Sequence, residues 1–192
     1  MIYDSLLVEC DGPIPLEGLA LVEKKLPRWQ DNVFMLVREA AQMTSDLVQK
    51  PAVGKHMCII SALMNVGSVK VQRAVAGFTM SGPHAYMTIQ QLLVAKRSGQ
   101  YLQVCSLTEL TDAAPGNAFL VHHSGHSVGV LVQEDGKAMV SDSSYPNIIS
   151  IRQHDFCAIL QQFHEDDGDT MLAVFKLKPA TSPAISTTSC ST

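Results

Sequence analysis

The chain has 192 residues, of which 46% are hydrophobic, and it carries 14 Lys and Arg against 18 Asp and Glu. This length and this apolar content suffice to bury a core, so we expect one domain. The mildly acidic balance, without a stripe of basic residues, excludes nucleic acid as the expected partner because little on the chain would track phosphates.

The N-terminal segment "MIYDSLLVECDG" places acidic residues where a Sec signal peptide would carry Lys or Arg. No apolar run in the sequence approaches the roughly 20 residues that cross a bilayer. We therefore expect no membrane span and no Sec export, and we expect the protein in the cytoplasm of the cell that makes it.

The N-terminal half of the chain has helical patterns. Residues 27–50 place apolar side chains near helical spacing between Pro27 and Pro51, which predicts one long amphipathic helix. The run "CIISALMNVG", which begins at Cys58, is almost wholly apolar and is bracketed by glycines, as a buried central helix would be. The segment "MTIQQLLVAKRS" predicts a further helix.

Beyond Gln100 the pattern changes to short segments rich in β-branched and other apolar residues, each bounded by Gly, Pro, Asp or Asn. We expect most of them to form one antiparallel sheet, with a helix over "RQHDFCAILQQFHE" before the last strand. The expected strands are "YLQVCSL", "NAFLVHH", "HSVGVLVQE", "KAMVSD" and "DTMLAVFKLK". Residues 1–178 thus form one α+β domain, and the Ser, Thr and Pro of residues 179–192 form a disordered tail.

The five cysteines are widely spaced and never form a C-x-x-C pair, which argues against a disulfide framework and against a zinc knuckle. They are Cys10, Cys58, Cys105, Cys157 and Cys190. Cys58 differs from the others because it stands at the predicted start of a helix, where the helix dipole favours the thiolate. A single cysteine is more often a small core residue, so a nucleophile also requires a base and a group that orients the base.

The segment "HSVGVLVQEDGKAMVSD" predicts a β-hairpin whose register decides whether His126 can meet Asp142. A two-residue turn at Asp135 and Gly136 places these two side chains on opposite faces. A three-residue loop, with Gly136 in the left-handed conformation, pairs Val128 with Asp142 instead. Asp142 then lies on the same face as His126, diagonally within reach, where it can orient a general base.

The stretch "HHSGH" also suggests a metal site, since clustered imidazoles bind zinc. His122 and His123 are neighbours that point to opposite faces of a strand, so three ligands cannot converge here without a loop. The favoured interpretation is that His122 and His123 are exposed loop residues beside one catalytic histidine, His126. We expect no metal ion and no other cofactor.

A cysteine at a helix start, a histidine at the head of a strand and an aspartate at the end of the next strand resemble the papain-like cysteine enzymes of the CA clan. Within that clan, "HSVGVLV" followed by "VSDSSYPN" is most similar to the compact bacterial effectors of the YopT type and to related effector deamidases. The resemblance implies a papain-like fold over residues 53–178, with Cys58 as nucleophile, His126 as base and Asp142 as orienting acid. It also implies a virulence effector that a specialised system secretes into a host cell.

The oxyanion hole is the part of the papain pattern that this sequence does not match. Papain keeps a glutamine six residues before the cysteine, and Ala52 stands at that position. Gln49 is the nearest candidate donor, although it comes three residues too early in the chain. The backbone amide of Cys58, at a helix start, is a second donor that needs no side chain.

These residues predict a monomeric hydrolase that cleaves an amide bond through a thioester at Cys58. A backbone peptide as substrate makes the enzyme a thiol protease, and a glutamine side chain makes it a deamidase. A peptidoglycan amidase is a third enzymatic alternative on the same residues. For the protease and the deamidase, the expected partner is a protein or peptide substrate. In a different class of function, the chain is a non-catalytic protein-binding module in which Cys58 is a core residue.

Overall fold

The structure is a computed structural model that describes residues 33–41, 43–48, 58–78, 85–123, 125–145, 147–166 and 172–180. In these residues, seven strands form one antiparallel sheet in the order β1-β6-β5-β4-β3-β7-β2. The strands are β1 (Met43–Val48), β2 (Gln100–Cys105), β3 (Ala118–His123), β4 (His126–Val132), β5 (Lys137–Ser141), β6 (Asn147–Arg152) and β7 (Leu172–Pro179). Together with the helices, this sheet confirms the predicted α+β class.

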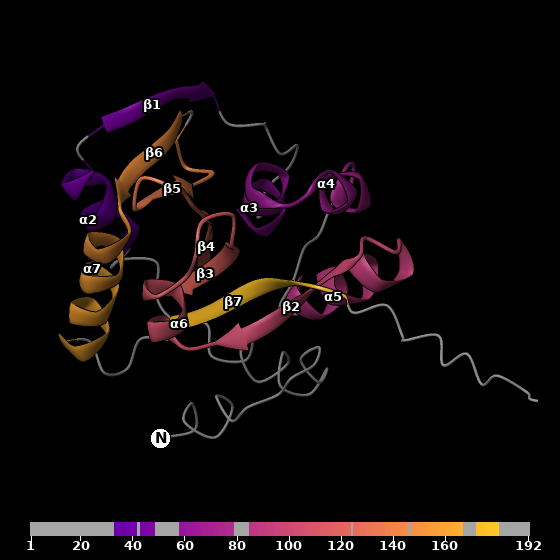
Figure 1. Cartoon of the computed structure of the whole chain (residues 1–192). Helices are drawn as coiled ribbons and strands as arrows, with labels where there is room; N and C mark the ends of the chain where they lie inside the picture. Colours follow the sequence, from indigo (N-terminus) through magenta and orange to yellow (C-terminus); the bar gives the residue numbers. More distant parts are fainter. Residues whose placement is uncertain are drawn as a thin grey trace, which may run out of the picture.

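Helices cover both faces of the sheet (Figure 1). They are α2 (Val33–Ala40), α3 (Cys58–Val66), α4 (Val69–Val75), α5 (Ala85–Ala95), α6 (Leu107–Thr111) and α7 (Gln153–Asp166). One apolar cluster packs α3, α4 and α5 against the sheet, and a second cluster packs α2, α6 and α7 against it. None of the helices in the described ranges is long and apolar enough to cross a membrane.

The interior strand β3 is buried along its whole length because both of its faces are covered. Leu120 belongs to the cluster under α3, α4 and α5, whereas Phe119 and Val121 belong to the cluster under α2, α6 and α7. Successive side chains on a strand point to opposite faces, so an apolar run such as "AFLV" serves both clusters. A fully buried Leu or Phe contributes about 1.5–3 kcal/mol relative to an exposed one.

Gly129 lets α3 pack directly on β4. A Cβ atom at this position would lie 2.9 Å from Cγ1 of Val66 and 3.0 Å from the carbonyl oxygen of Ala62. The backbones of α3 and β4 therefore lie closer to each other than they could if a residue with a side chain replaced Gly129. This close packing holds Cys58, the first residue of α3, near His126, the first residue of β4.

The β4–β5 hairpin has the three-residue loop, which is one of the two alternatives that the sequence left open. Gln133 donates its amide hydrogen to the carbonyl of Lys137 at 2.8 Å, and the ladder continues with Val132 opposite Ala138. Gly136 has a φ of 73°, the left-handed conformation that the loop requires. This register is the alternative that allows His126 to meet Asp142.

The single long helix predicted over residues 27–50 is wrong. Helix α2 ends at Ala40, and Met43–Val48 forms β1, an edge strand paired with β6. The segment "TSD" within β1 consists of weak helix formers, so pairing with β6 prevails over the apolar spacing. The strand β6 and the short helices α4 and α6 were also absent from the prediction. Residues 27–32 and the predicted tail beyond Ala180 lie outside the described residues.

Candidate active site

Cys58 is the first residue of α3 and is partly buried. Its thiol forms hydrogen bonds with the ring of His126 and with both the hydroxyl and the backbone amide of Ser127. Burial acts to raise the pKa of the Cys58 thiol, but the hydrogen bond and charge of His126, together with the Ser127 donors, outweigh it. The net result is a pKa below the usual value, so the site favours a thiolate.

His126 is the first residue of β4, and its ring lies between Cys58 and Asp142. Its Nε2 atom is 2.7 Å from Oδ1 of Asp142, which leaves Nδ1 as the ring nitrogen that can face Cys58. Burial acts to lower the pKa of His126, but the hydrogen bonds and charges of Asp142 and Cys58 outweigh it and raise the pKa to about 9. The imidazolium is therefore the favoured form at neutral pH.

Asp142 follows β5 directly and is held by the turn that it begins. Its Oδ1 atom accepts hydrogen bonds from Nε2 of His126 at 2.7 Å and from the backbone amide of Ser144 at 2.9 Å. The amide of Tyr145 donates to the carbonyl of Asp142 at 3.0 Å and closes the turn. Although burial acts to raise the pKa of the Asp142 carboxyl, the hydrogen bond and charge of His126, with the hydrogen bonds of the Ser144 amide and side chain, lower it. The carboxylate is thus fixed in a position that orients the His126 ring.

Phe34 of α2 packs against the His126 ring, with the two ring centroids 5.8 Å apart in an edge-on arrangement. Phe34 is itself almost fully buried. The imidazole is therefore restrained from two layers of the molecule, by α2 on one side and by α3 on the other. Sequence reasoning missed Phe34, because an apolar residue on an amphipathic helix looks like any other core residue.

Ser127, Tyr86 and His122 also belong to the site and were also missed as site residues. The Ser127 hydroxyl contacts the Tyr86 hydroxyl at 2.6 Å and Nδ1 of His122 at 2.9 Å. A serine at a buried strand position next to the candidate histidine was the available sequence signal. Tyr86 comes from α5, about forty residues earlier, and had no local signal.

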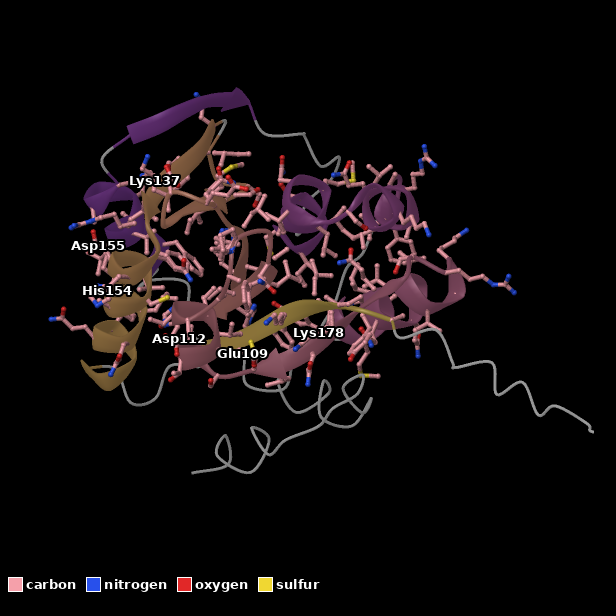
Figure 2. All side chains as sticks on the ribbon, viewed as in Figure 1. Glu109, Asp112, Lys137, His154, Asp155 and Lys178 are labelled. Atoms are coloured by element: carbon pink, nitrogen blue, oxygen red, sulfur yellow. The ribbon has the colours of Figure 1, made fainter. Side chains whose placement is uncertain are left out.

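The other two cysteines in the described residues are packing residues. Burial and the charge of Glu109 raise the pKa of Cys105 to about 12, although Lys176 and Lys178 act in the opposite direction. Figure 2 shows Glu109 near Lys178, and Oε1 of Glu109 lies 3.6 Å from Nζ of Lys178. Burial likewise raises the pKa of Cys157. Both thiols lie in the core.

The predicted exposure of the two histidines before the β3–β4 turn is wrong. His122 and His123 are the last two residues of β3, and their exposed fractions are 6% and 1%. They are covered because helices pack on both faces of this strand. Within the described ranges, no group of three or more His, Cys, Asp or Glu side chains is arranged to hold a metal ion.

The sequence offered two candidate oxyanion donors, the side chain of Gln49 and the backbone amide of Cys58. Gln49 and Ala52 lie outside the described residues. The first amide groups of a helix have no partner within that helix, so the start of α3 presents backbone donors beside the Cys58 thiol. A carbonyl oxygen under attack by Cys58 would need donors of this kind.

The chain was also compared with known proteins. No protein-family model matches it, and no curated protein matches it significantly.

Proposed function

We propose that the protein is a papain-like thiol hydrolase that cleaves peptide bonds, with Cys58 as nucleophile, His126 as general acid and base, and Asp142 as the orienting group. The observation that carries the proposal is a continuous chain of hydrogen bonds from the Cys58 thiol through the His126 ring to the Asp142 carboxylate. These three side chains come from a helix start, a strand start and a strand end. Buried core residues have no need of such an arrangement.

The charges of the site suit the first half of the reaction. The Cys58 thiolate attacks the carbonyl carbon of the substrate amide, and the C=O π electrons move to the oxygen. The backbone amides at the start of α3 stabilise the resulting oxyanion. When the intermediate collapses, the C–N bond breaks and the His126 imidazolium donates its proton to the leaving nitrogen. The products of this half are a thioester at Cys58 and a free amine.

The second half uses the same residues with the roles of acid and base exchanged. Neutral His126 removes a proton from a water molecule, whose oxygen attacks the thioester carbon. The C–S bond then breaks, which releases the carboxylic acid and restores the Cys58 thiolate beside the His126 imidazolium. Asp142 holds the ring in one orientation and stabilises its charged form throughout.

The arrangement of elements supports the papain-like part of this proposal. A helix that starts with the nucleophile packs on an antiparallel sheet that carries the base and the orienting acid, in the chain order cysteine, histidine, aspartate. The resemblance of "HSVGVLV" and "VSDSSYPN" to effectors of the YopT type extends the proposal to a host protein as the substrate.

A peptide-cleavage assay tests the proposal. The purified protein is incubated with a complex mixture of peptides, and mass spectrometry identifies new termini and any glutamine converted to glutamate. New termini that are absent with Cys58→Ala support a protease. Conversion of glutamine alone, again dependent on Cys58, assigns a deamidase to the same site.

Release of amine groups from peptidoglycan, with no effect on peptides, would assign an amidase. Full inactivity on all three substrates, with a Cys58 thiol no more reactive than Cys105, would contradict the proposal. That result would favour the non-catalytic binding module.

A further inference from the structure

Ser127 lies next to His126 on β4, but its side chain points to the other face of the strand. It is fully buried, with an exposed fraction of 0%, and it stands opposite His122 in the β3–β4 ladder. Helices α3 and α5 cover this face, and α5 brings the Tyr86 hydroxyl to the same point. A polar group this deep in the protein needs partners, because an unsatisfied hydroxyl in the core is costly.

Three groups surround the Ser127 hydroxyl. Tyr86 Oη lies 2.6 Å from Oγ of Ser127 and Nδ1 of His122 lies 2.9 Å from it. The Ser127 side chain also acts on Cys58, where its hydrogen bonding lowers the pKa of the thiol. A serine hydroxyl has one hydrogen to donate and two lone pairs that accept. The three contacts therefore use the whole capacity of the group, provided that two neighbours donate to Ser127 and one accepts from it.

The chemistry of the three neighbours decides the direction of each bond. A thiolate has no hydrogen, so Cys58 in its reactive form can only accept. Tyr86 carries a hydroxyl hydrogen, and neutral His122 carries one hydrogen on its ring. Burial and the nearby charges of His123 and His126 lower the pKa of His122 to about 3, so this ring is neutral and can place its hydrogen on Nδ1.

We propose that Ser127 is a second hydrogen-bond donor to the Cys58 thiolate, and that Tyr86 and His122 are positioning residues that hold its hydroxyl in the donating direction. Both lone pairs of Ser127 Oγ are then occupied, by Tyr86 and His122, and its one hydrogen points at the Cys58 sulfur. The inference rests on the proposed function, because it takes Cys58 to be the nucleophilic thiolate.

This arrangement gives the thiolate support that does not depend on His126. The charged group acting on Cys58 from β4 is His126, and Ser127 adds a neutral donor from the opposite face of the same strand. The sulfur is thus held from two sides. The sulfur carries no charge while the thioester exists, and Ser127 donates to the thiolate again when the C–S bond breaks.

The pH profile of Cys58 alkylation by iodoacetamide tests the inference in the full-length protein. Peptide mass spectrometry measures the labelling rate at Cys58, which follows the thiolate fraction. Ser127→Ala removes the donor, and we expect the midpoint of the profile to move to higher pH by about one unit, since hydrogen bonds to charged groups are worth roughly this much. The rate below the midpoint should fall by about tenfold.

Ser98→Ala is the matched control. Ser98 is also buried, and its hydroxyl bonds only to the backbone of nearby Gln100 among the contacts described. Removal of this hydroxyl deletes a buried serine of similar type away from Cys58, so the midpoint should not change.

Tyr86→Phe is the second variant, and it retains both Cys58 and Ser127. We expect a smaller shift in the same direction, because one of the two groups that orient the hydroxyl is lost. If Ser127→Ala does not fold, Tyr86→Phe alone decides the matter, and an unchanged midpoint in that variant overturns the inference.

An unchanged midpoint in folded Ser127→Ala also overturns the inference but leaves the proposed function intact. A wild-type midpoint at the value of an ordinary thiol, unaffected by His126→Ala, would instead contradict the proposed function itself.

Discussion

Cys58 begins α3 and Cys105 ends β2, and burial acts on both thiols to raise their pKa values. At Cys105 the charge of Glu109 adds to this effect, and the pKa reaches about 12. At Cys58 the ring of His126 and the donors of Ser127 reverse the effect. The two regions differ in the groups that face the sulfur, and these groups decide which thiol can react.

Two contributions favour a thiolate at Cys58, one from the start of α3 and one from the neighbouring His126. A helix start favours a thiolate at Cys58, yet this contribution is modest and decays within one turn. The larger contribution comes from His126, which reaches Cys58 only because Gly129 lets α3 lie on β4. A reactive thiol here is a product of tertiary packing as much as of local sequence.

The largest expected effect follows from removal of Cys58 or His126. Cys58→Ala and His126→Ala should each reduce turnover by about a thousandfold or more, and the double variant should lose little beyond either single one, because the two residues act as a unit. Cys105→Ala should retain turnover. Kinetics on the substrate found in the peptide screen measure the effect, and circular dichroism checks the fold.

One pair of results would contradict a catalytic role for Cys58. If Cys58→Ala unfolds the domain while His126→Ala has no effect in any functional assay, Cys58 is a packing residue like Cys105.

Loss of Asp142 should have a smaller effect. Asp142→Ala removes the carboxylate that orients the His126 ring but keeps both reacting groups, so turnover should exceed that of Cys58→Ala by about tenfold to a hundredfold. Ser143→Ala is a suitable control, because Ser143 is exposed in the same turn, whereas both the amide and the side chain of Ser144 form hydrogen bonds that act on Asp142. Equal losses in Asp142→Ala and Cys58→Ala would require a more direct role for Asp142.

A change in the β4–β5 loop should affect the site from a distance. Gly136→Val places a β-branched residue at a φ of 73°, where such residues are strained even though the added Cβ would meet no atom within 4 Å. We expect a severalfold loss of Cys58 labelling, because the loop sets the register that pairs His126 with Asp142.

Glu134→Val is the control for this loop variant, since Glu134 is exposed in the same loop and is not among the residues with positive φ. A normal fold with unchanged Cys58 labelling in Gly136→Val would show that the loop does not set the site.

The pH dependence should give the smallest effect. The pKa of His126 is raised, so the imidazolium needed for proton donation persists above neutral pH and is lost as pH rises through about 9. Turnover should therefore fall by about half at that pH and continue to fall above it. In Asp142→Ala the alkaline limb should move to lower pH, because one of the groups that raise the pKa of His126 is gone. A limb that stays in place would exclude Asp142 as a partner of His126.

Much of the sheet could be predicted, because strands β3, β4, β5 and β7 are short apolar runs with clear turn residues at their ends. The hairpin register was left open by the sequence, because a two-residue turn and a three-residue loop both place Gly136 in the left-handed conformation. The strand β1 could not be predicted, because apolar residues at helical spacing extend into it and only pairing with β6 distinguishes it from a helix.

The sequence predicts the three reacting residues of the candidate site but not the residues that pack around them. Cys58, His126 and Asp142 have the residue types of a hydrolase and stand at the ends of elements, where a sequence pattern can find them. Tyr86 and Phe34 reach the site through packing between helices and the sheet, and no spacing in the sequence records such contacts. The burial of His122 follows from helices on both faces of β3, which the local sequence does not show.

Competitive alkylation of the native protein tests the central claim most directly. Iodoacetamide is added near neutral pH, and peptide mass spectrometry compares labelling at Cys58, Cys105 and Cys157 in the wild type and in His126→Ala. The account predicts that Cys58 in the wild type reacts far faster than the other two and that His126→Ala removes most of this advantage. Equal labelling of the three cysteines in the native wild type, or a Cys58 rate that does not change in His126→Ala, would contradict it.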